Sequence, residues 1–224
     1  MITVILTGAN RGLGHELHQL LVEGSPSIQG IFISRQPLPS VREQDIYIQA
    51  DFEHDDLREL ALKLSLTSKV IVFINNAGTI EPIAKAVELD QTSMENALRV
   101  NCMAPLVLAQ RLALEAEKNG GRLLILNISS GAARRPIKGW MAYCVSKAAA
   151  VMALDVLAAE NNHIEVRHID PGVMDTRMQE HIRRQSPATM PDVGAFQNFK
   201  EQQVLKEPKE VAEHIIGIVQ DMAL

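Results

Sequence analysis

Short runs of β-branched and aliphatic residues recur along the chain, separated by longer stretches with apolar residues at helical spacing. The runs predict six strands, over residues 2–6, 28–34, 46–50, 70–75, 122–128 and 164–169. Several runs have no polar alternation, and residues 70–74 are apolar throughout. This pattern is typical of strands that are buried on both faces of a parallel sheet. We therefore expect helices on both faces.

The stretches between the runs predict helices over residues 12–23, 54–65, 91–118, 142–161 and 208–222. Pro105 lies inside the third of these and predicts a kink. The alternation of strand and helix predicts an α/β fold, a Rossmann-type doubly wound parallel sheet in a single domain over residues 1–224. Residues 174–204, which we call the flap, show little periodicity. We expect an irregular segment that covers a substrate site, with a plain surface loop as the alternative.

Composition narrows the class of protein. With 46% hydrophobic and 22% charged residues, the chain has the balance of an ordinary globular protein. Its formal net charge of -5 gives no clustered basic surface, so we expect no nucleic-acid partner. No stretch approaches the roughly 20 apolar residues of a membrane-spanning helix, and the amino terminus lacks the features of a signal peptide. We expect a cytoplasmic protein without a membrane partner.

Metal chemistry has little support in the sequence. His15 and His18 lie three residues apart on a predicted helix, but no cysteine or carboxylate pattern completes a site. We expect both histidines at the surface and no metal. Cys102 and Cys144 are expected to be reduced and buried.

Glycines follow the first predicted strand, where residues 7–14 read Thr-Gly-Ala-Asn-Arg-Gly-Leu-Gly. Glycines allow a tight turn and let the backbone approach a pyrophosphate at the amino end of a helix. This turn predicts a dinucleotide site with contacts from Gly8, Asn10, Arg11, Gly12, Leu13 and Gly14.

The end of the second predicted strand bears on the choice of cofactor. An acidic residue there would bind the adenosine ribose of NAD, but this strand ends in Ser34 and Arg35. Arg35 and Arg11 can pair with a 2′-phosphate, and Ser34 can donate a hydrogen bond to it. We therefore expect NADP(H), the alternative being that both arginines are solvated surface groups.

Tyr143 and Lys147 lie four residues apart on a predicted helix, which places both side chains on one face. A nearby ammonium group would lower the phenol pKa from about 10 and make Tyr143 a general acid. Ser130 follows a strand, where its hydroxyl can hold a carbonyl oxygen as negative charge develops. Ser129 is the less favoured neighbour.

This Tyr-x-x-x-Lys pattern resembles the active-site signature of the short-chain dehydrogenase/reductase family. The resemblance extends in order through the glycine turn, Asp51, residues 75–78, Asn101, residues 127–130 and Pro171-Gly172, over most of the chain. Within the family, residues 138–144 and 170–179 resemble the sepiapterin reductase and benzil reductase group.

The resemblance implies further roles. Lys147 would hold the nicotinamide ribose, and Asn101 would shape its helix and position a proton-relaying water. It implies cofactor contacts along the backbone of Asn76, Ala77 and Gly78 and at the adenine from Asp51, with Phe52 beside it. It also implies contacts to the carboxamide from Pro171, Val173 and Thr176. Asn-Ala-Gly and Pro-Gly are also good plain turns.

Together these features predict an NADPH-dependent carbonyl reductase that acts on a ketone or diketone as its small-molecule substrate. One alternative is a ketoacyl-carrier reductase, supported by the basic residues Arg134, Arg135 and Lys138. The other is a binding module that senses NADPH without turnover, because a fold alone does not prove catalysis. The resemblance implies a homodimer or tetramer.

Overall fold

The computed structural model describes residues 2–221, and its strands form one six-stranded parallel sheet in the order β3-β2-β1-β4-β5-β6. The strands are β1 (Ile2–Thr7), β2 (Ile28–Ser34), β3 (Ile46–Gln49), β4 (Val70–Asn75), β5 (Arg122–Ile128) and β6 (Ile164–Ile169). All six predicted strands and the doubly wound fold class are confirmed. The strand order reverses between β1 and β4, which is where such sheets bind ligands beyond the carboxyl ends of their strands.

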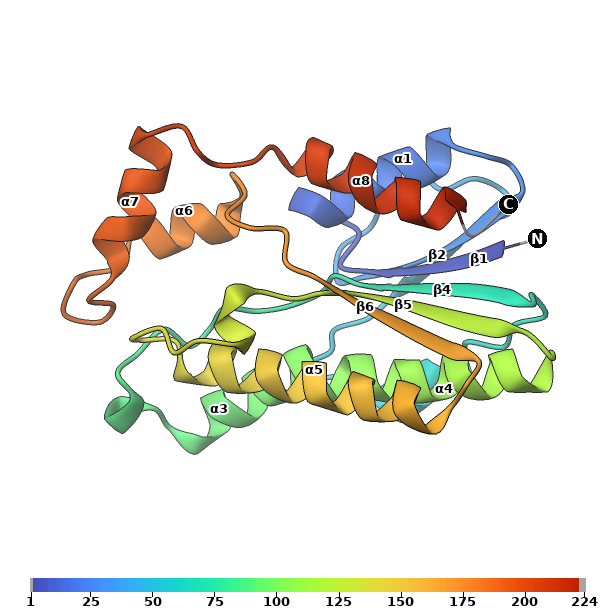
Figure 1. Ribbon diagram of the computed structural model, residues 1–224, viewed down its shortest axis with the longest axis horizontal. Coiled ribbons are helices and arrows are strands. Elements are labelled where there is room, and N and C mark those ends of the chain that lie inside the picture. The colour runs from blue at the N-terminus through green and yellow to red at the C-terminus, as the bar shows by residue number, and fades with distance from the viewer. Residues whose placement is uncertain (1, 222–224) are drawn as a thin grey trace.

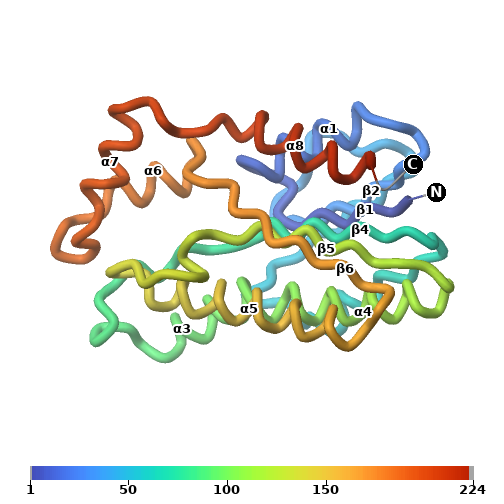
Figure 2. The backbone as a smooth tube through the Cα atoms, viewed as in Figure 1, coloured from blue at the N-terminus to red at the C-terminus, as the bar shows by residue number. Residues whose placement is uncertain are grey.

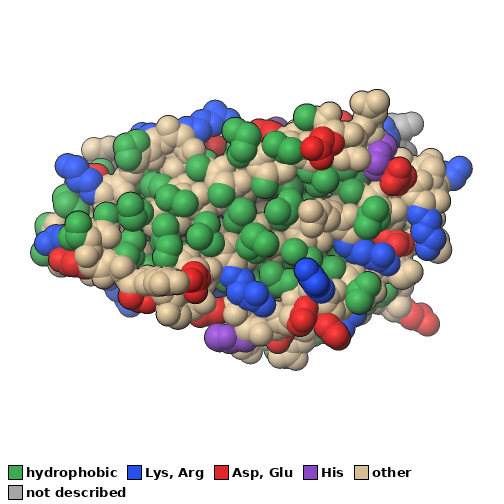
Figure 3. Space-filling view, turned by 90° about the horizontal axis from the view of Figure 1, so that it is seen from below, with side chains coloured by type: hydrophobic (Ala, Val, Ile, Leu, Met, Phe, Trp, Pro, Cys, Tyr) green, Lys and Arg blue, Asp and Glu red, His purple; other side chains and the backbone are tan. Residues whose placement is uncertain are grey.

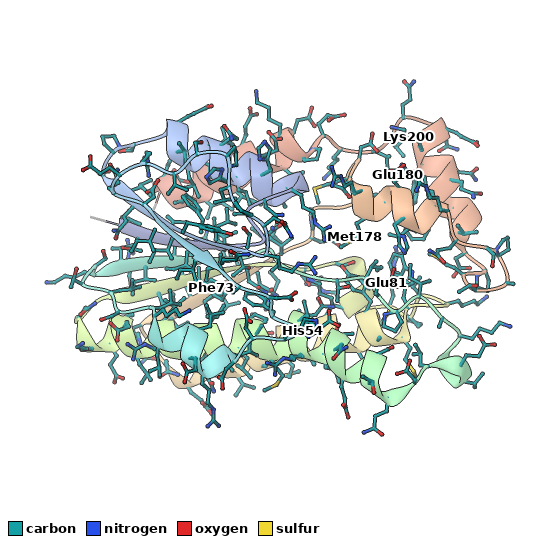
Figure 4. All side chains as sticks on the ribbon, turned by 180° about the vertical axis from the view of Figure 1, so that it is seen from behind. His54, Phe73, Glu81, Met178, Glu180 and Lys200 are labelled. Carbon is teal, nitrogen blue, oxygen red and sulfur yellow. The ribbon has the colours of Figure 1, made fainter. Side chains whose placement is uncertain are left out.

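Helices cover both faces of the sheet (Figure 1). One face carries α1 (Gly12–Glu23) and α8 (Pro208–Asp221), and the other carries α2 (Leu57–Leu62), α3 (Gln91–Leu98), α4 (Ala104–Lys118) and α5 (Met141–Glu160). Alternate residues of β4 enter the two cores, with Val72 and Ile74 toward α1 and α8 and Phe73 toward α4. Figure 4 shows Phe73 between the sheet and the helices. Burial on both faces explains the missing polar alternation.

The predicted helix over residues 91–118 is helical throughout and changes its winding once. A π-helical segment, Arg99–Met103, separates α3 from α4. The expected kink is thus a change of winding just before Pro105, which lies in the first turn of α4. The backbone stays helical from α3 through this segment into α4, and Ala104 N donates to Arg99 O in the π pattern. Pro105 has no N–H with which to continue the hydrogen-bond pattern, which accounts for the change of winding at this place.

The predicted helix over residues 54–65 is shorter than expected. It begins after Asp56, whose carboxylate accepts hydrogen bonds from the backbone N–H groups of Arg58 and Glu59 at 2.8 and 3.1 Å. The helix predicted to end at residue 222 is observed to Asp221, and Met222 lies outside the described residues.

The flap is not irregular, so that prediction was wrong. It contains α6 (Arg177–Arg183) and α7 (Val193–Glu201), which extend beyond the carboxyl ends of the strands, opposite both termini (Figure 2). Both helices are too short for a clear sequence period. Burial of Ile182 and Val193 in one apolar cluster with Trp140 stabilises them, and this tertiary packing is invisible in local sequence.

Helix α5 corrects the expectation that no stretch of the chain is long and apolar enough to span a membrane. It is long and apolar enough to cross a membrane by length and composition alone, with a mean hydropathy of 1.5 over 18 residues, a third of which are buried inside the fold. Leu154 and Ala150 pack inward, while Met152 is 65% exposed. Figure 3 shows hydrophobic side chains spread over this face of the molecule. The exposed apolar residues of α5, α4 and the π-helical segment are Met103, Leu114, Met141, Val145, Met152 and Val156.

Two expectations about single residues also change. His18 is fully buried with its ring edge-on to Phe32 at 4.6 Å, so its predicted place at the surface was wrong. Cys102 and Cys144 are both free thiols, and Cys144 is half-buried rather than buried.

Candidate active site

Tyr143, Ser130 and Lys147 meet at the carboxyl end of β5. Tyr143 and Lys147 lie one turn apart on α5, and both side chains are buried. Ser130 follows β5, where its Oγ accepts a hydrogen bond from Ala132 N at 3.2 Å and also hydrogen-bonds the Tyr143 hydroxyl. The structure therefore brings together the two hydroxyl groups that the sequence assigned to the carbonyl oxygen.

The pKa values of Tyr143 and Lys147 differ from the expectation that Lys147 lowers the pKa of the phenol. Burial raises the pKa of Tyr143 to about 12, outweighing the hydrogen bond from Ser130 that lowers it. Burial also lowers the pKa of Lys147 to about 8. Lys147 Nζ donates to Ile128 O at 2.8 Å and lies 5.8 Å from the centroid of the Tyr143 ring. The prediction that Lys147 lowers the phenol pKa is thus wrong for this structure, because desolvation dominates.

Asn101 lies in the π-helical segment and braces α5. Its Nδ2 donates to Thr79 O at 2.8 Å and to Ser146 Oγ at 3.0 Å, while its Oδ1 accepts from Thr79 N at 2.8 Å. Both amide hydrogens are therefore in use, and the side chain has no donor left for the expected relay water. Ser146 is a residue that sequence reasoning missed. Its only signal was its position between Tyr143 and Lys147.

The glycine turn after β1 is held against β4. Gly8 and Gly12 have φ angles of 70° and 51°, which favour glycine. A Cβ on Gly14 would lie 2.0 Å from Gly8 O. Asn76 Nδ2 donates to Thr7 O and Gly8 O at 3.1 and 3.2 Å, so this predicted cofactor residue locks the turn with its side chain.

The turn also leaves donors open at the amino end of α1. Arg11 is the N-cap residue of α1 and makes no side-chain capping bond. First-turn N–H groups have no partner inside a helix and favour an anion. The close glycine backbone and these groups fit the pyrophosphate of a nicotinamide dinucleotide. Leu13 is buried in the core, so only its backbone can take part. Asn10 and Ala77 are part of the same junction between β1 and β4.

The residues expected at the adenosine end behave differently from one another. Arg11 and Arg35 are exposed, whereas Ser34 is buried and its Oγ donates to Gln36 O at 2.7 Å. The single hydroxyl hydrogen of Ser34 is therefore already used, contrary to the expected donation to a phosphate.

The residues after β3 also have internal partners. Asp51 Oδ1 accepts from Glu53 N at 3.1 Å. Phe52 packs its ring into the core, and its carbonyl oxygen accepts from Arg99 Nε at 3.0 Å. The ring of Phe52 therefore has a structural role.

The segment after β6 passes beside the glycine turn. A Cβ on Gly12 would lie 3.5 Å from Thr176 Cγ2, and Thr176 Oγ1 accepts from Gln179 N at 3.4 Å at the start of α6. Val173 O accepts from Lys206 N at 3.0 Å, and Pro171 is buried. The structure thus brings Thr176 beside the glycine turn, where the pyrophosphate of a cofactor would fit.

An apolar cluster covers Tyr143. The Trp140 ring lies edge-on to the Tyr143 ring at 5.6 Å, and the Phe196 ring lies 5.1 Å from Trp140. Sequence reasoning missed both aromatic residues. The other buried members come from the loop after β4, the turn after β5 and the flap: Ile80, Ile83, Ala132, Ile182, Met190 and Val193.

The flap is tied to the opposite side of the site. Figure 4 shows Met178 of α6 on one side of the site and Glu81 of the loop after β4 on the other. His181 Nε2 lies 2.5 Å from Glu81 Oε1 and links α6 to that loop. Asp175 Oδ2 lies 2.5 Å from Lys200 Nζ and links the start of the flap to α7. These contacts hold the apolar cover over Tyr143.

Comparison with known proteins fits this geometry, since the short chain dehydrogenase family model matches residues 2–187. The chain belongs to the short-chain dehydrogenase family. The expected family is therefore confirmed. This family comprises oxidoreductases that use nicotinamide cofactors.

Relatives in this family include the group expected from the sequence. Benzil reductase ((S)-benzoin forming) of Bacillus subtilis (strain 168) is 29% identical, over 96% of this chain and 92% of that one. Sepiapterin reductase of Bos taurus is 29% identical, over 97% of this chain and 89% of that one. The solved structure of 4-hydroxyisoleucine dehydrogenase complexed with NADH shares the fold, with a TM-score of 0.82 at 21% identity, covering 100% of this chain and 93% of that one.

Proposed function

We propose that this short-chain dehydrogenase is an NADPH-dependent reductase that transfers a hydride to a ketone or diketone. The observation that carries the proposal is the hydrogen-bonded pair of Ser130 and Tyr143, with Lys147 one helical turn away, under an apolar cover. Family membership supports oxidoreductase chemistry at this pair.

The chain's own residues have distinct tasks in this reaction. When bound, the cofactor supplies the hydride. The Ser130 hydroxyl holds the carbonyl oxygen while negative charge develops. Tyr143 then donates its proton to that oxygen, and its raised pKa keeps it protonated at neutral pH. Lys147 would hold the nicotinamide ribose, as the family resemblance implies. The flap excludes water.

The preference for NADP over NAD rests on charge at the end of β2. Arg35 and Arg11 are exposed there, and no carboxylate follows the strand to repel a phosphate. We expect tighter binding of NADPH than of NADH. Titration of each nucleotide by fluorescence tests this, and equal affinities would contradict the preference.

The substrate class rests on the aromatic cover formed by Trp140 and Phe196 and on the named activities of the relatives. Two substrates would be offered with NADPH while the reduced-nicotinamide absorbance is followed. One is benzil, which is a simple aromatic diketone, and the other is sepiapterin. We expect faster consumption with the diketone. Binding of NADPH without turnover on a broad carbonyl panel would instead favour the sensor alternative.

The assignment of Tyr143 is tested with Tyr143→Phe. This variant keeps the ring against Trp140 but removes the proton donor. We expect NADPH binding to persist while turnover falls by a factor of about 100 to 10,000, the usual contribution of general acid catalysis. Full activity would overturn the role.

We further propose a cytoplasmic homodimer that pairs through the exposed apolar residues of α4 and α5 (Figure 3). An apolar face of this extent favours a partner surface, and the family resemblance implies a second copy of the chain. Light scattering after gel filtration tests the state. Met152→Glu should yield monomers, and a wild-type monomer would contradict the proposal.

A further inference from the structure

Three arginines from separate elements lie at the carboxyl end of the sheet. Arg11 belongs to the turn after β1, Arg35 follows β2, and Arg177 is the first residue of α6. The backbone brings their elements together. Gly8 N donates to Ile33 O at 2.8 Å, which holds the turn against β2.

The flap reaches the same place through its first helix. Thr176 lies against Gly12, with its Cγ2 3.5 Å from where a glycine Cβ would be, and Arg177 follows directly. Partial burial and then the guanidinium groups of Arg35 and Arg177 lower the pKa of Arg11. Arg11 is therefore close enough to Arg35 and to Arg177 to be repelled by each of them.

Nothing in the described part of the chain neutralises this cluster with an ion pair. The acidic neighbours of Arg177 are occupied elsewhere. Asp175 pairs with Lys200 and Arg183, and Glu180 pairs with Arg184. Uncompensated like charges destabilise a fold and are relieved when an anion binds between them.

We infer that Arg177 is a third cationic residue of the cofactor's phosphate site and that it ties the flap to the bound cofactor. The inference rests on the proposed function, since it needs a dinucleotide bound at the glycine turn after β1. A guanidinium group suits phosphate because its planar donors match the phosphate oxygens. Arg177 begins the helix whose Ile182 belongs to the same buried apolar cluster as Tyr143. A phosphate held at one end of α6 therefore stabilises the apolar cover at the other.

The test compares Arg177→Gln with Arg184→Gln, a matched variant at the opposite end of α6 whose partner is Glu180. Dissociation constants for NADPH and NADH would be measured by nucleotide fluorescence. Hydrogen exchange of residues 177–201 would be followed with and without NADPH. We expect Arg177→Gln to weaken NADPH binding on the order of tenfold, the size of one charge-assisted contact, and Arg184→Gln to stay near wild type. NADPH should slow exchange in the flap of the wild type and of Arg184→Gln more than in Arg177→Gln.

The outcomes separate the possibilities. Loss for NADPH alone would place Arg177 at the 2′-phosphate, and loss for both nucleotides would place it at the pyrophosphate. Unchanged affinities and unchanged flap exchange in Arg177→Gln, with normal wild-type binding, would overturn the role of Arg177 alone. Failure of the wild type to bind either nucleotide would overturn the proposed function and this inference with it.

Discussion

Asn101 donates a side-chain hydrogen bond to Ser146 Oγ at 3.0 Å, joining the π-helical segment to α5. Ser146 in turn donates to Tyr143 O at 3.0 Å. The two bonds form a chain from the segment before α4 to the backbone of the proposed acid. The change of winding at Arg99–Met103 thus has a function, because it places Asn101 within reach of α5.

Replacing Ser146 should disturb this chain. In Ser146→Ala, a buried N–H of Asn101 loses its acceptor, and the free energy of unfolding should fall by about 1–3 kcal/mol. We also expect a lower kcat with an unchanged dissociation constant for NADPH. Urea unfolding and steady-state kinetics measure the two effects.

Ser68→Ala is the matched control, since it removes the buried Ser68 to Thr3 hydroxyl contact of 2.7 Å at the amino end of the sheet. It should lower stability and leave kcat alone. Equal kinetic effects in the two variants would argue against a positioning role for Ser146.

The glycine turn should tolerate no side chain at Gly14. An alanine Cβ would lie 2.0 Å from Gly8 O, a backbone atom that cannot turn aside. We expect Gly14→Ala to lose several kcal/mol of stability, on the scale of severe overpacking, together with nucleotide binding. Thermal unfolding and fluorescence titration check both losses.

Gly217 supplies the control in α8, where a Cβ would meet no atom within 4 Å. Gly217→Ala should raise stability by up to about 1 kcal/mol, because alanine is the better helix former. A similar loss in both variants would contradict the explanation by close approach.

Lys147 should make stability depend on pH in the alkaline range. Its pKa is about 8 in the fold against a usual 10.5, so between these values the unfolded chain binds more protons. The free energy of unfolding should therefore rise from pH 8 toward pH 10 and fall as the pH is lowered again.

Urea unfolding of the wild type and of Lys147→Met between these pH values measures this contribution. The rise should disappear in the variant. Tyr143 acts with the opposite sign and only above its usual pKa of 10, so it does not disturb this window. A slope that survives in Lys147→Met would show that another group causes it.

The aromatic cover should set the affinity for the carbonyl substrate. Phe196→Ala removes ring contacts to Trp140 and Phe199, each worth about 0.5–1.5 kcal/mol beyond area burial. We expect a higher KM for aromatic diketones with little change in the NADPH dissociation constant. Val87→Ala is the control because Val87 is 93% exposed. An unchanged KM would place the substrate away from the flap.

Much of this architecture was predictable because its causes are local. Apolar runs set the strands, and the spacing of four residues placed Tyr143 and Lys147 on one helix face. The glycine turn and the order of the motifs indicated the family that comparison confirmed.

The tertiary structure alone decided the rest. The flap forms helices because Ile182 and Val193 are buried in one apolar cluster with Trp140, which is remote in sequence. Burial raises the pKa of Tyr143 where spacing to Lys147 suggested a fall. The sequence by itself determined the elements and the reactive groups, because these depend on near neighbours. Only the fold determined their solvation and their partners, because both depend on which distant residues exclude water.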